Sequence, residues 1–261
     1  MVVTAETEEQ RRRREDLRGL FDGIAGRYDA SRPGYPAEIV DAVCASAGIS
    51  RGAEVLEIGC GTGQLTRQLA GRGFNLTAID IGAAMIDAAR TSVADPLVRF
   101  EVCSFEEFAG GTQFDLIVSA TAFHWVDPGI GLAKAARLLR RGGWLALLTT
   151  EESYPEPLRS QLRELWMRYG HRNTMPASQP AWLSALQESA SFGPTVELLH
   201  TRTLRLPAPA VLGVERTRAT FLSFSERDQE RFTADLGASL ASGCDVDLSQ
   251  ETLLAMAPAT S

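Results

Sequence analysis

The sequence predicts an α/β protein in which a mostly parallel sheet is covered by helices on both faces. Three observations predict it. Between about residues 50 and 150, short apolar runs alternate with segments whose apolar residues recur at helical spacing. A glycine-rich turn joins the first apolar run to the first helical segment. The chain has 261 residues, 44% of them hydrophobic, which suits one soluble domain with a sizeable core.

Seven segments are expected to form the strands. Five lie in the alternating region and two follow it, and Gly142 with Gly143 is expected to turn the chain into the fifth. The expected strands are Glu54–Ile58, Asn75–Asp80, Val98–Cys103, Phe114–Ala120, Trp144–Thr150, Val196–Leu206 and Asp245–Met256.

Helices are expected wherever apolar residues return every three or four positions. Between the strands, the pair Leu65 and Leu69 predicts one helix, and the triplet Met85, Ile86 and Ala89 predicts another. After Thr150 a longer amphipathic helix is predicted, followed by a short helix around residues 182–189 and another behind Ser225, which with Asp228 resembles a capping box. The longer helix rests on Leu158, Leu162, Leu165 and Tyr169.

The chain is expected to hold one domain, residues 19–261, behind a charged extension over residues 1–18. Its core would span residues 50–150, with a helical region over about 151–243. Ahead of the core, a loop is expected to carry Tyr28, Arg32 and Tyr35.

Composition excludes several classes of protein. The net charge is −7 and the only basic cluster is Arg11–Arg14, which argues against nucleic-acid binding. No apolar run reaches 18 residues, so no membrane span is expected, and the polar start of the chain lacks the apolar stretch of a secretory signal. The cytoplasm is therefore the expected location. The four cysteines are scattered without a CxxC pair, so neither a metal site nor a disulfide is expected: Cys44, Cys60, Cys103 and Cys244.

The strongest local signal is Glu57-Ile58-Gly59-Cys60-Gly61-Thr62-Gly63, between the first strand and a helix. Alternate glycines let the backbone turn tightly and approach a ligand where a Cβ would collide, and the helix N-terminus presents N–H groups to it. A dinucleotide-binding loop would need its third glycine at position 64, which is Gln64.

The pattern E-x-G-x-G-x-G resembles motif I of the class I methyltransferases that use S-adenosylmethionine (SAM). Tyr28, Arg32-Pro33-x-Tyr35-Pro36 and the pair His124-Trp125 resemble, over residues 20–150, the small-molecule subgroup that includes trans-aconitate methyltransferases. This resemblance implies a Rossmann-like fold with a seven-stranded, mostly parallel sheet and a small helical lid. It also implies SAM as methyl donor and S-adenosylhomocysteine as product.

The resemblance implies where the cofactor would bind. Asp80, which ends the second strand, would accept hydrogen bonds from the ribose hydroxyls, although Asp also favours helix N-caps. Arg32 would pair with the SAM carboxylate or else be a surface arginine, and Met85 would line the adenine or simply belong to the core. The full expected set is Tyr28, Arg32, Glu57, Gly59, Cys60, Gly61, Gly63, Asp80, Ile81, Met85, Ser104, Phe105 and Ala120.

The methyl acceptor is expected beside the end of the fourth strand and under residues 151–243. His124 would be a general base for a hydroxyl acceptor, or otherwise a residue that packs beside the cleft. Tyr35, Trp125 and Trp166 are the expected substrate-binding residues. Arg216 and Arg218 would meet an anionic acceptor or lie on a helix surface.

The expected activity is in-line transfer of a methyl group from SAM to an O, N or C atom of a small molecule. The sequence leaves two alternatives: an RNA or protein methyltransferase, and a SAM-binding protein that transfers no methyl. The expected partner is a small-molecule substrate, without nucleic acid or membrane, and the chain is expected to be a monomer or a homodimer.

Overall fold

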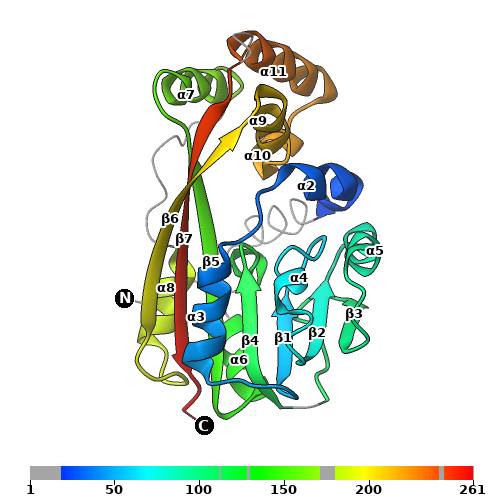
Figure 1. Cartoon of the computed structure of the whole chain (residues 1–261), viewed down its shortest axis with the longest axis vertical. Helices are drawn as coiled ribbons and strands as arrows, with labels where there is room; N and C mark the ends of the chain where they lie inside the picture. Colours follow the sequence, from blue (N-terminus) through cyan, green and yellow to red (C-terminus); the bar gives the residue numbers. More distant parts are fainter. Residues whose placement is uncertain (1–18, 112, 128–129, 171–179, 241–243, 261) are drawn as a thin grey trace.

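The computed structural model describes residues 19–111, 113–127, 130–170, 180–240 and 244–260, so the predicted extension 1–18 lies outside the described residues. One seven-stranded sheet runs through the molecule in the order β3-β2-β1-β4-β5-β7-β6 (Figure 1). Strands β1 to β5 are parallel, and β7 is antiparallel to both β5 and β6. The strands are β1 Glu54–Ile58, β2 Asn75–Asp80, β3 Val98–Val102, β4 Phe114–Ala120, β5 Leu139–Ser153, β6 Val196–Leu206 and β7 Val246–Pro258. The predicted fold class is confirmed.

Helices cover both faces of this sheet. Helices α3 (Ala37–Ala47) and α4 (Thr66–Leu69) pack on one face, against Val55 and Leu116. Helices α6 (Gly131–Leu138) and α8 (Ala181–Glu188) pack on the other, against Leu56 and Ile117. Helix α5 (Ala83–Ser92) lies beside β2 and β3. Neighbouring residues of one strand thus enter two separate cores, because successive side chains of a strand point to opposite faces.

A third hydrophobic cluster lies beyond the carboxyl ends of the parallel strands. It joins helices α7 (Leu158–Arg168), α9 (Ala208–Glu215), α10 (Ala219–Leu222) and α11 (Glu226–Ser239), which we call the lid (Figure 1). Phe232 and Phe221 are fully buried in it. The other two elements between residues 151 and 243, α8 and β6, belong to the sheet layer instead.

Several predicted elements differ from the structure. Strand β3 ends at Val102 rather than Cys103, and β7 spans Val246–Pro258 rather than Asp245–Met256. Strand β5 begins at Leu139 rather than Trp144, and Gly142 and Gly143 lie inside it at a shift in its register with β4. The backbone requires glycine here: Gly142 has φ +75°, and a Cβ on Gly143 would lie 2.8 Å from the Phe114 carbonyl oxygen. Tyr28 lies in helix α2 (Ala25–Ser31), not in the predicted loop.

The N-terminal segment reaches the carboxyl ends of the parallel strands through short helices. The 3₁₀ helix η1 (Asp22–Ile24) precedes α2, and Asp22 Oδ1 accepts a hydrogen bond of 2.7 Å from the Ala84 N–H in the first turn of α5. An acidic side chain from another part of the chain thus satisfies a free N–H of that helix end. Among the described helices, none combines the length and apolar character needed to cross a bilayer.

The capping interaction at the start of α11 gives a testable prediction of stability. The Ser225 hydroxyl accepts a hydrogen bond of 3.2 Å from the Asp228 N–H, as the sequence predicts. Ser225→Ala should lower the free energy of unfolding by about 1 kcal/mol, because an N–H at the helix start loses its partner. Urea denaturation followed by circular dichroism measures this. Ser239→Ala, in the last turn of the same helix, should change stability by less than about 0.5 kcal/mol.

Candidate functional site

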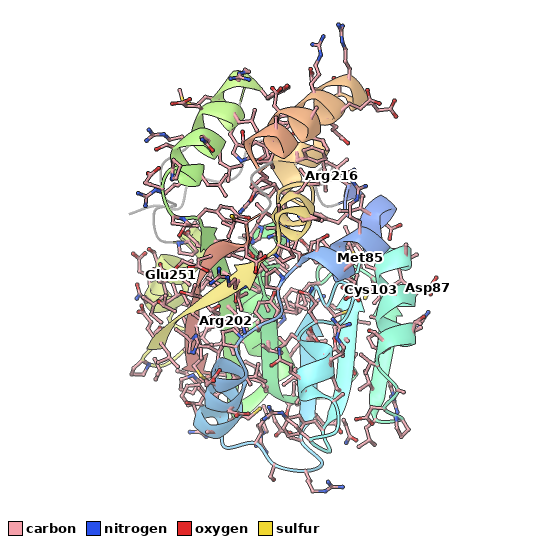
Figure 2. All side chains as sticks on the ribbon, turned by 45° about the horizontal axis from the view of Figure 1, so that its top comes forward. Met85, Asp87, Cys103, Arg202, Arg216 and Glu251 are labelled. Atoms are coloured by element: carbon pink, nitrogen blue, oxygen red, sulfur yellow. The ribbon has the colours of Figure 1, made fainter. Side chains whose placement is uncertain are left out.

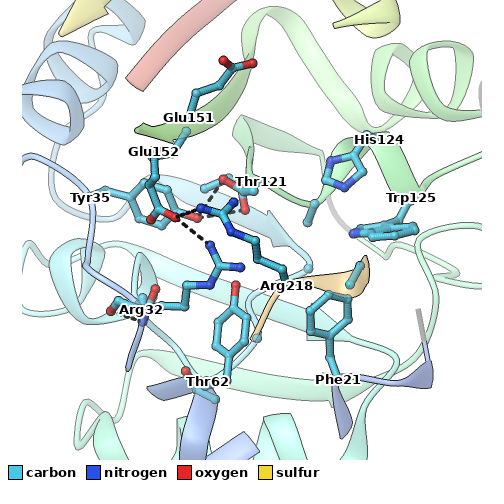
Figure 3. A pocket seen from close by; sticks show the side chains of 18 of the residues that line it. Phe21, Arg32, Tyr35, Thr62, Thr121, His124, Trp125, Glu151, Glu152 and Arg218 are labelled. Atoms are coloured by element: carbon cyan, nitrogen blue, oxygen red, sulfur yellow. Dashed lines mark hydrogen bonds and ion pairs between the residues drawn. The ribbon is translucent and has the colours of Figure 1, made fainter. Parts of the chain in front are cut away.

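A cavity of about 920 Å³ opens at the carboxyl ends of β1, β2, β4 and β5, between the sheet, the N-terminal helices and the lid (Figure 3). Ligands of open α/β sheets bind at this edge, because the chain diverges there to opposite faces of the sheet. One end of the cavity is lined by Gly61 and Asp80, and the other by Trp166 and Arg218.

The three glycines of the loop after β1 have different roles. All three have positive φ, which favours glycine. A Cβ on Gly59 would lie 2.3 Å from that of Ala122, so Gly59 permits two loops to approach. A Cβ on Gly63 would press on Ala89 of α5 at 3.3 Å, and Gly63 does not line the cavity. Gly61 alone of the three lines the cavity with nothing within 4 Å of an added Cβ.

Asp80 holds this glycine loop in place. Its two carboxylate oxygens accept hydrogen bonds of 2.9 Å from the Gly61 N–H and from the Gly82 N–H. In the first turn of α5, the N–H groups of Ala84 and Met85 donate to Asp22 Oδ1. Asp80 is therefore not the main capping group of that helix. The carboxylate lines the cavity beside the loop that it orients.

Glu57, at the end of β1, is the second carboxyl group here and its environment is different. Its side chain is buried and accepts a hydrogen bond of 2.7 Å from the Thr66 hydroxyl. Burial raises the pKa of Glu57 to about 8, and the negative charge of Asp80 adds to this effect. Neighbouring strand ends thus hold one hydrogen-bonded carboxylate and one carboxyl group that retains its proton near neutral pH.

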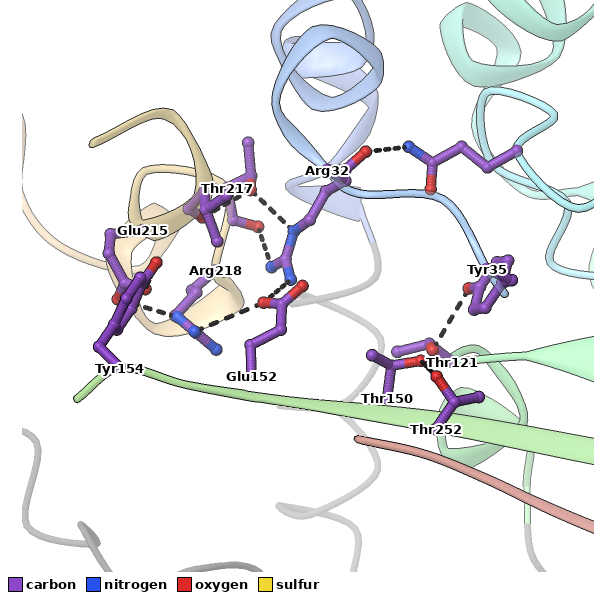
Figure 4. Close-up of polar contacts among 12 residues, drawn as sticks. Arg32, Tyr35, Thr121, Thr150, Glu152, Tyr154, Glu215, Thr217, Arg218 and Thr252 are labelled. Carbon is purple, nitrogen blue, oxygen red and sulfur yellow. Dashed lines mark hydrogen bonds and ion pairs between the residues drawn. The ribbon is translucent and has the colours of Figure 1, made fainter. Parts of the chain in front are cut away.

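Arg32 comes from the N-terminal segment and is bound to two other parts of the chain (Figure 4). Its guanidinium donates to Glu152 Oε2 at 3.1 Å and to the Thr217 hydroxyl at 2.8 Å. It also lies over the ring of Tyr28, 5.6 Å from the ring centroid. Arg32 lines the cavity, and its predicted pairing with a ligand carboxylate stays a prediction.

The lid end of the cavity is organised by the buried carboxylate of Glu215. It accepts hydrogen bonds from the Tyr154 hydroxyl at 3.2 Å, from Trp166 Nε1 at 3.2 Å and from Arg218 Nε at 2.9 Å. The Arg218 guanidinium also lies 3.5 Å from Glu152, as Figure 4 shows. Arg218 therefore lines the cavity rather than lying on an outer helix surface. Arg216 does not line it, and its Nε is buried without a hydrogen-bond partner.

His124 and Trp125 lie in the 3₁₀ helix η2 (Phe123–Trp125) just after β4, their ring centroids 4.7 Å apart. His124 is exposed towards the cavity, and the protein atoms packed around it lower the pKa of its imidazole to about 4. The imidazole is therefore neutral at physiological pH. The Tyr35 hydroxyl donates to the Ala120 carbonyl at 3.1 Å, and burial raises its pKa.

The structure brings together most of the predicted site residues. Those that line the cavity are Tyr28, Arg32, Tyr35, Glu57, Gly59, Cys60, Gly61, Asp80, Ile81, Met85, Phe105, Ala120, His124, Trp125 and Trp166. Gly63 and Ser104 do not. The Ser104 hydroxyl instead donates to the Glu107 carboxylate at 2.8 Å and accepts from the Glu107 N–H, in a local turn.

Several lining residues were missed by the sequence reasoning. Thr121 has φ +53°, unusual for a residue with a Cβ, and follows β4 where the chain turns over the cavity. Glu215 is the one charged residue of the apolar helix α9 and lies three residues before Arg218, a local signal that the sequence reasoning did not use. Glu152 has no such local signal, because its partners Arg32 and Arg218 are far from it in sequence. Others that were missed are Phe21, Thr62, Gln64, Thr150 and Tyr154.

The raised pKa of Glu57 predicts how its contribution to stability depends on pH. The folded state keeps a proton up to about pH 8, whereas the unfolded carboxyl group loses it near 4.5. This group therefore contributes stability below about pH 4.5, and that contribution is lost as the pH rises through 8. Glu57→Gln, which stays neutral, should lose less stability than the wild type between pH 5 and 8.5.

Urea titrations across this pH range test the prediction, with exposed Glu188→Gln of α8 as the control. Parallel stability curves for Glu57→Gln and the wild type would contradict it.

Comparison with known proteins agrees with this geometry. The family model described as a methyltransferase domain matches residues 56–147. An uncharacterized methyltransferase of Mycobacterium tuberculosis is 33% identical over 135 residues, 52% of this chain and 54% of that protein, so the match spans about half the relative's length. A demethylmenaquinone methyltransferase of Tropheryma whipplei is 30% identical over 186 residues, 67% of this chain and 75% of that protein.

Among solved structures, a putative type II methyltransferase from Anaeromyxobacter dehalogenans shares the fold. Its TM-score is 0.62 at 22% identity, and the match covers 87% of this chain and 97% of that one. The strand order, the glycine loop with its acidic neighbours and these sequence matches agree with one another. The chain belongs to the class I SAM-dependent methyltransferase family.

Proposed function

We propose that this chain binds SAM around Gly61 and Asp80 and transfers its methyl group to a small-molecule acceptor under the lid. One observation carries the proposal: a single cavity runs from the glycine loop after β1 to Trp166 and Arg218 of the lid. A donor at one end would therefore share one cavity with an acceptor at the other. The lid residues that line this cavity favour a small molecule over a macromolecule.

The lining residues fit the chemical groups of SAM. Gly61 leaves space where a Cβ would intrude, so the backbone can lie against the ligand. The Asp80 carboxylate lines the cavity beside Gly61, and a carboxylate is the kind of acceptor to which ribose hydroxyls donate. Met85 and Phe105 offer an apolar surface to an adenine ring. The volume of about 920 Å³ is within the range of sites that hold ligands of this size.

SAM, when bound, supplies a methyl group made electrophilic by its sulfonium sulfur. The chain's own residues hold the acceptor in position, which can account for up to roughly 7–11 kcal/mol of a barrier in ideal cases. Phe21, Tyr28 and Trp125 form an aromatic wall, with ring centroids of Phe21 5.9 Å from Tyr28 and 6.1 Å from Trp125. This wall and the lid keep water away from the reacting groups.

His124 is the proposed general base when the acceptor is a hydroxyl group. Its neutral imidazole faces the cavity and has a free lone pair at physiological pH. A carboxylate or neutral amine acceptor needs no such base. Tyr35, Trp125 and Trp166 are the proposed contacts to the acceptor.

The acceptor is proposed to be a small molecule, as in the subgroup that the Tyr28–Pro36 and His124-Trp125 motifs resemble. The relative named demethylmenaquinone methyltransferase supports this class. The net charge of −7 disfavours an RNA substrate. We further propose a cytoplasmic location.

Methyl transfer is tested by incubating the protein with SAM and panels of hydroxyl, amine and carboxylate compounds and measuring formation of S-adenosylhomocysteine. SAM binding without turnover on any compound would favour a binding protein instead.

Asp80→Ala should weaken SAM binding by about 1–3 kcal/mol, because hydrogen bonds to a charged acceptor are lost. Isothermal titration calorimetry measures this directly. Asp87→Ala is the matched control, since Asp87 lies on neighbouring α5 and points into solvent (Figure 2). Equal affinities of the two variants would remove Asp80 from the cofactor site.

His124→Ala should reduce turnover of a hydroxyl acceptor by roughly 10²–10⁴-fold, because the proton has no nearby acceptor. Affinity for SAM should be unchanged. His200→Ala, on β6, is the control and should keep full activity. A loss of less than about threefold in His124→Ala would demote the imidazole to a wall of the cavity.

A further inference from the structure

Strand β6 forms one edge of the sheet in the part of the chain that the structure describes. It has eleven residues, hydrogen-bonds along its whole length to β7, and is the last strand in the sheet order (Figure 1). In an antiparallel ladder, alternate residues direct both N–H and C=O to opposite sides. Every second residue of β6 therefore presents these groups away from β7, and among the described residues no strand pairs with them.

This edge carries the charged side chains of Glu197, Arg202 and Arg205, but lacks other features that normally protect one. β6 contains neither proline nor glycine, and its pairing with β7 has no bulge. The opposite edge strand, β3, has only five residues. Three large apolar side chains near the start of β6 are exposed: Val196 by 47%, Leu198 by 42% and Leu199 by 61%. Such an edge is a template for another strand.

The sequence of β6, VELLHTRTLRL, is complementary to itself in one antiparallel register. About a two-fold axis at Thr201, Glu197 faces Arg205 of a second copy, and Arg205 faces the second Glu197. Leu198 faces Leu204 and Val196 faces Leu206. His200 faces Arg202 of the second copy. Within its own chain His200 lies near Glu38, and Arg202 donates a hydrogen bond to Gln250.

Other registers lose this match. A shift of one residue in either direction places Glu197 opposite Leu204 or Leu206, and a shift of two places it opposite Thr203 or beyond the partner strand. Side chains directly opposite in an antiparallel pair lie about 4.5–5.5 Å apart at Cβ, so opposite charges attract and like charges repel.

Both charged groups, Glu197 and Arg205, are exposed, and the Arg205 side chain is 73% exposed. Within its own chain Glu197 accepts a hydrogen bond from Gln187 and Arg205 pairs with Asp245, and both contacts lie at the surface, where a second copy can reach the same charges.

We propose that two copies of this chain associate through their β6 strands, antiparallel about Thr201, which joins two seven-stranded sheets into one. The occupant of the edge is a second copy rather than an unrelated strand, because the two Glu197–Arg205 pairs form only in a self-pairing. The interface is isologous and closes after two subunits, as two-fold interfaces do. It lies outside the cavity, so it does not depend on the proposed substrate.

Sedimentation equilibrium of the full chain tests the proposal. The wild type should show twice the chain mass of 28.3 kDa. Glu197→Arg and Arg205→Glu should each weaken self-association by about tenfold, since two attractive pairs become repulsive. Arg99→Glu, an exposed charge reversal on the opposite edge strand β3, should leave it unchanged.

An equimolar mixture of the two single variants is the decisive experiment. In the mixed dimer each substituted residue faces an opposite charge on the other copy, so this dimer should form with wild-type affinity. The double variant should dimerise with itself for the same reason. Loss of folding in either variant would prevent this rescue, and near-ultraviolet circular dichroism monitors it. A monomeric wild type, single variants that dimerise like the wild type, or a mixture that stays monomeric would each overturn the proposal.

Discussion

The carboxylate of Glu152 is the interaction on which the enclosed cavity depends. Glu152 is the last residue but one of β5, and its carboxylate pairs with the guanidinium of Arg32 from the N-terminal segment and with that of Arg218 from the lid. The side chain is only 4% exposed, so removing either arginine would leave a poorly solvated charge. Three segments that share no secondary structure are thus held over the same strand ends. Glu215 extends the arrangement by positioning Trp166 and Tyr154 in the cavity wall.

The same edge of the sheet separates two carboxyl groups by their surroundings. Asp80 is bonded by two backbone N–H groups and serves as a fixed acceptor that shapes the glycine loop. Glu57, one strand away, is buried and keeps its proton to about pH 8. Backbone hydrogen bonds favour the charged form of a carboxyl group, whereas burial favours the neutral form. The same functional group, a carboxyl, therefore has two different environments beside the loop.

Much of the fold could be predicted because its signals are local. The residues 54–58, 75–80, 114–120 and 196–206 were predicted with the boundaries that the structure has. The fifth strand was predicted too short at both ends. Before Trp144 it is extended by pairing of Leu139 with Phe114 of β4, and after Thr150 by pairing with β7 up to Ser153 and Ser249; neither contact is visible in the strand itself. Tyr28 was placed in a loop because Pro33 and Pro36 dominated the local pattern, while α2 packs against α9 of the lid.

For the site, the sequence by itself determined the glycine loop, the acidic residues at two strand ends and the His124-Trp125 pair, because each depends on spacing within a few residues. Tertiary structure alone decided that Gly61, and not Gly63, faces the cavity, and that Ser104 bonds to Glu107 outside it. It alone also decided that Arg32 and Arg218 meet at Glu152, whereas the Glu215–Arg218 pair has the local spacing of three residues. The physical reason is that an isolated charge in a sequence carries no information about its partner; burial selects the partner, and burial exists only once distant segments have packed together.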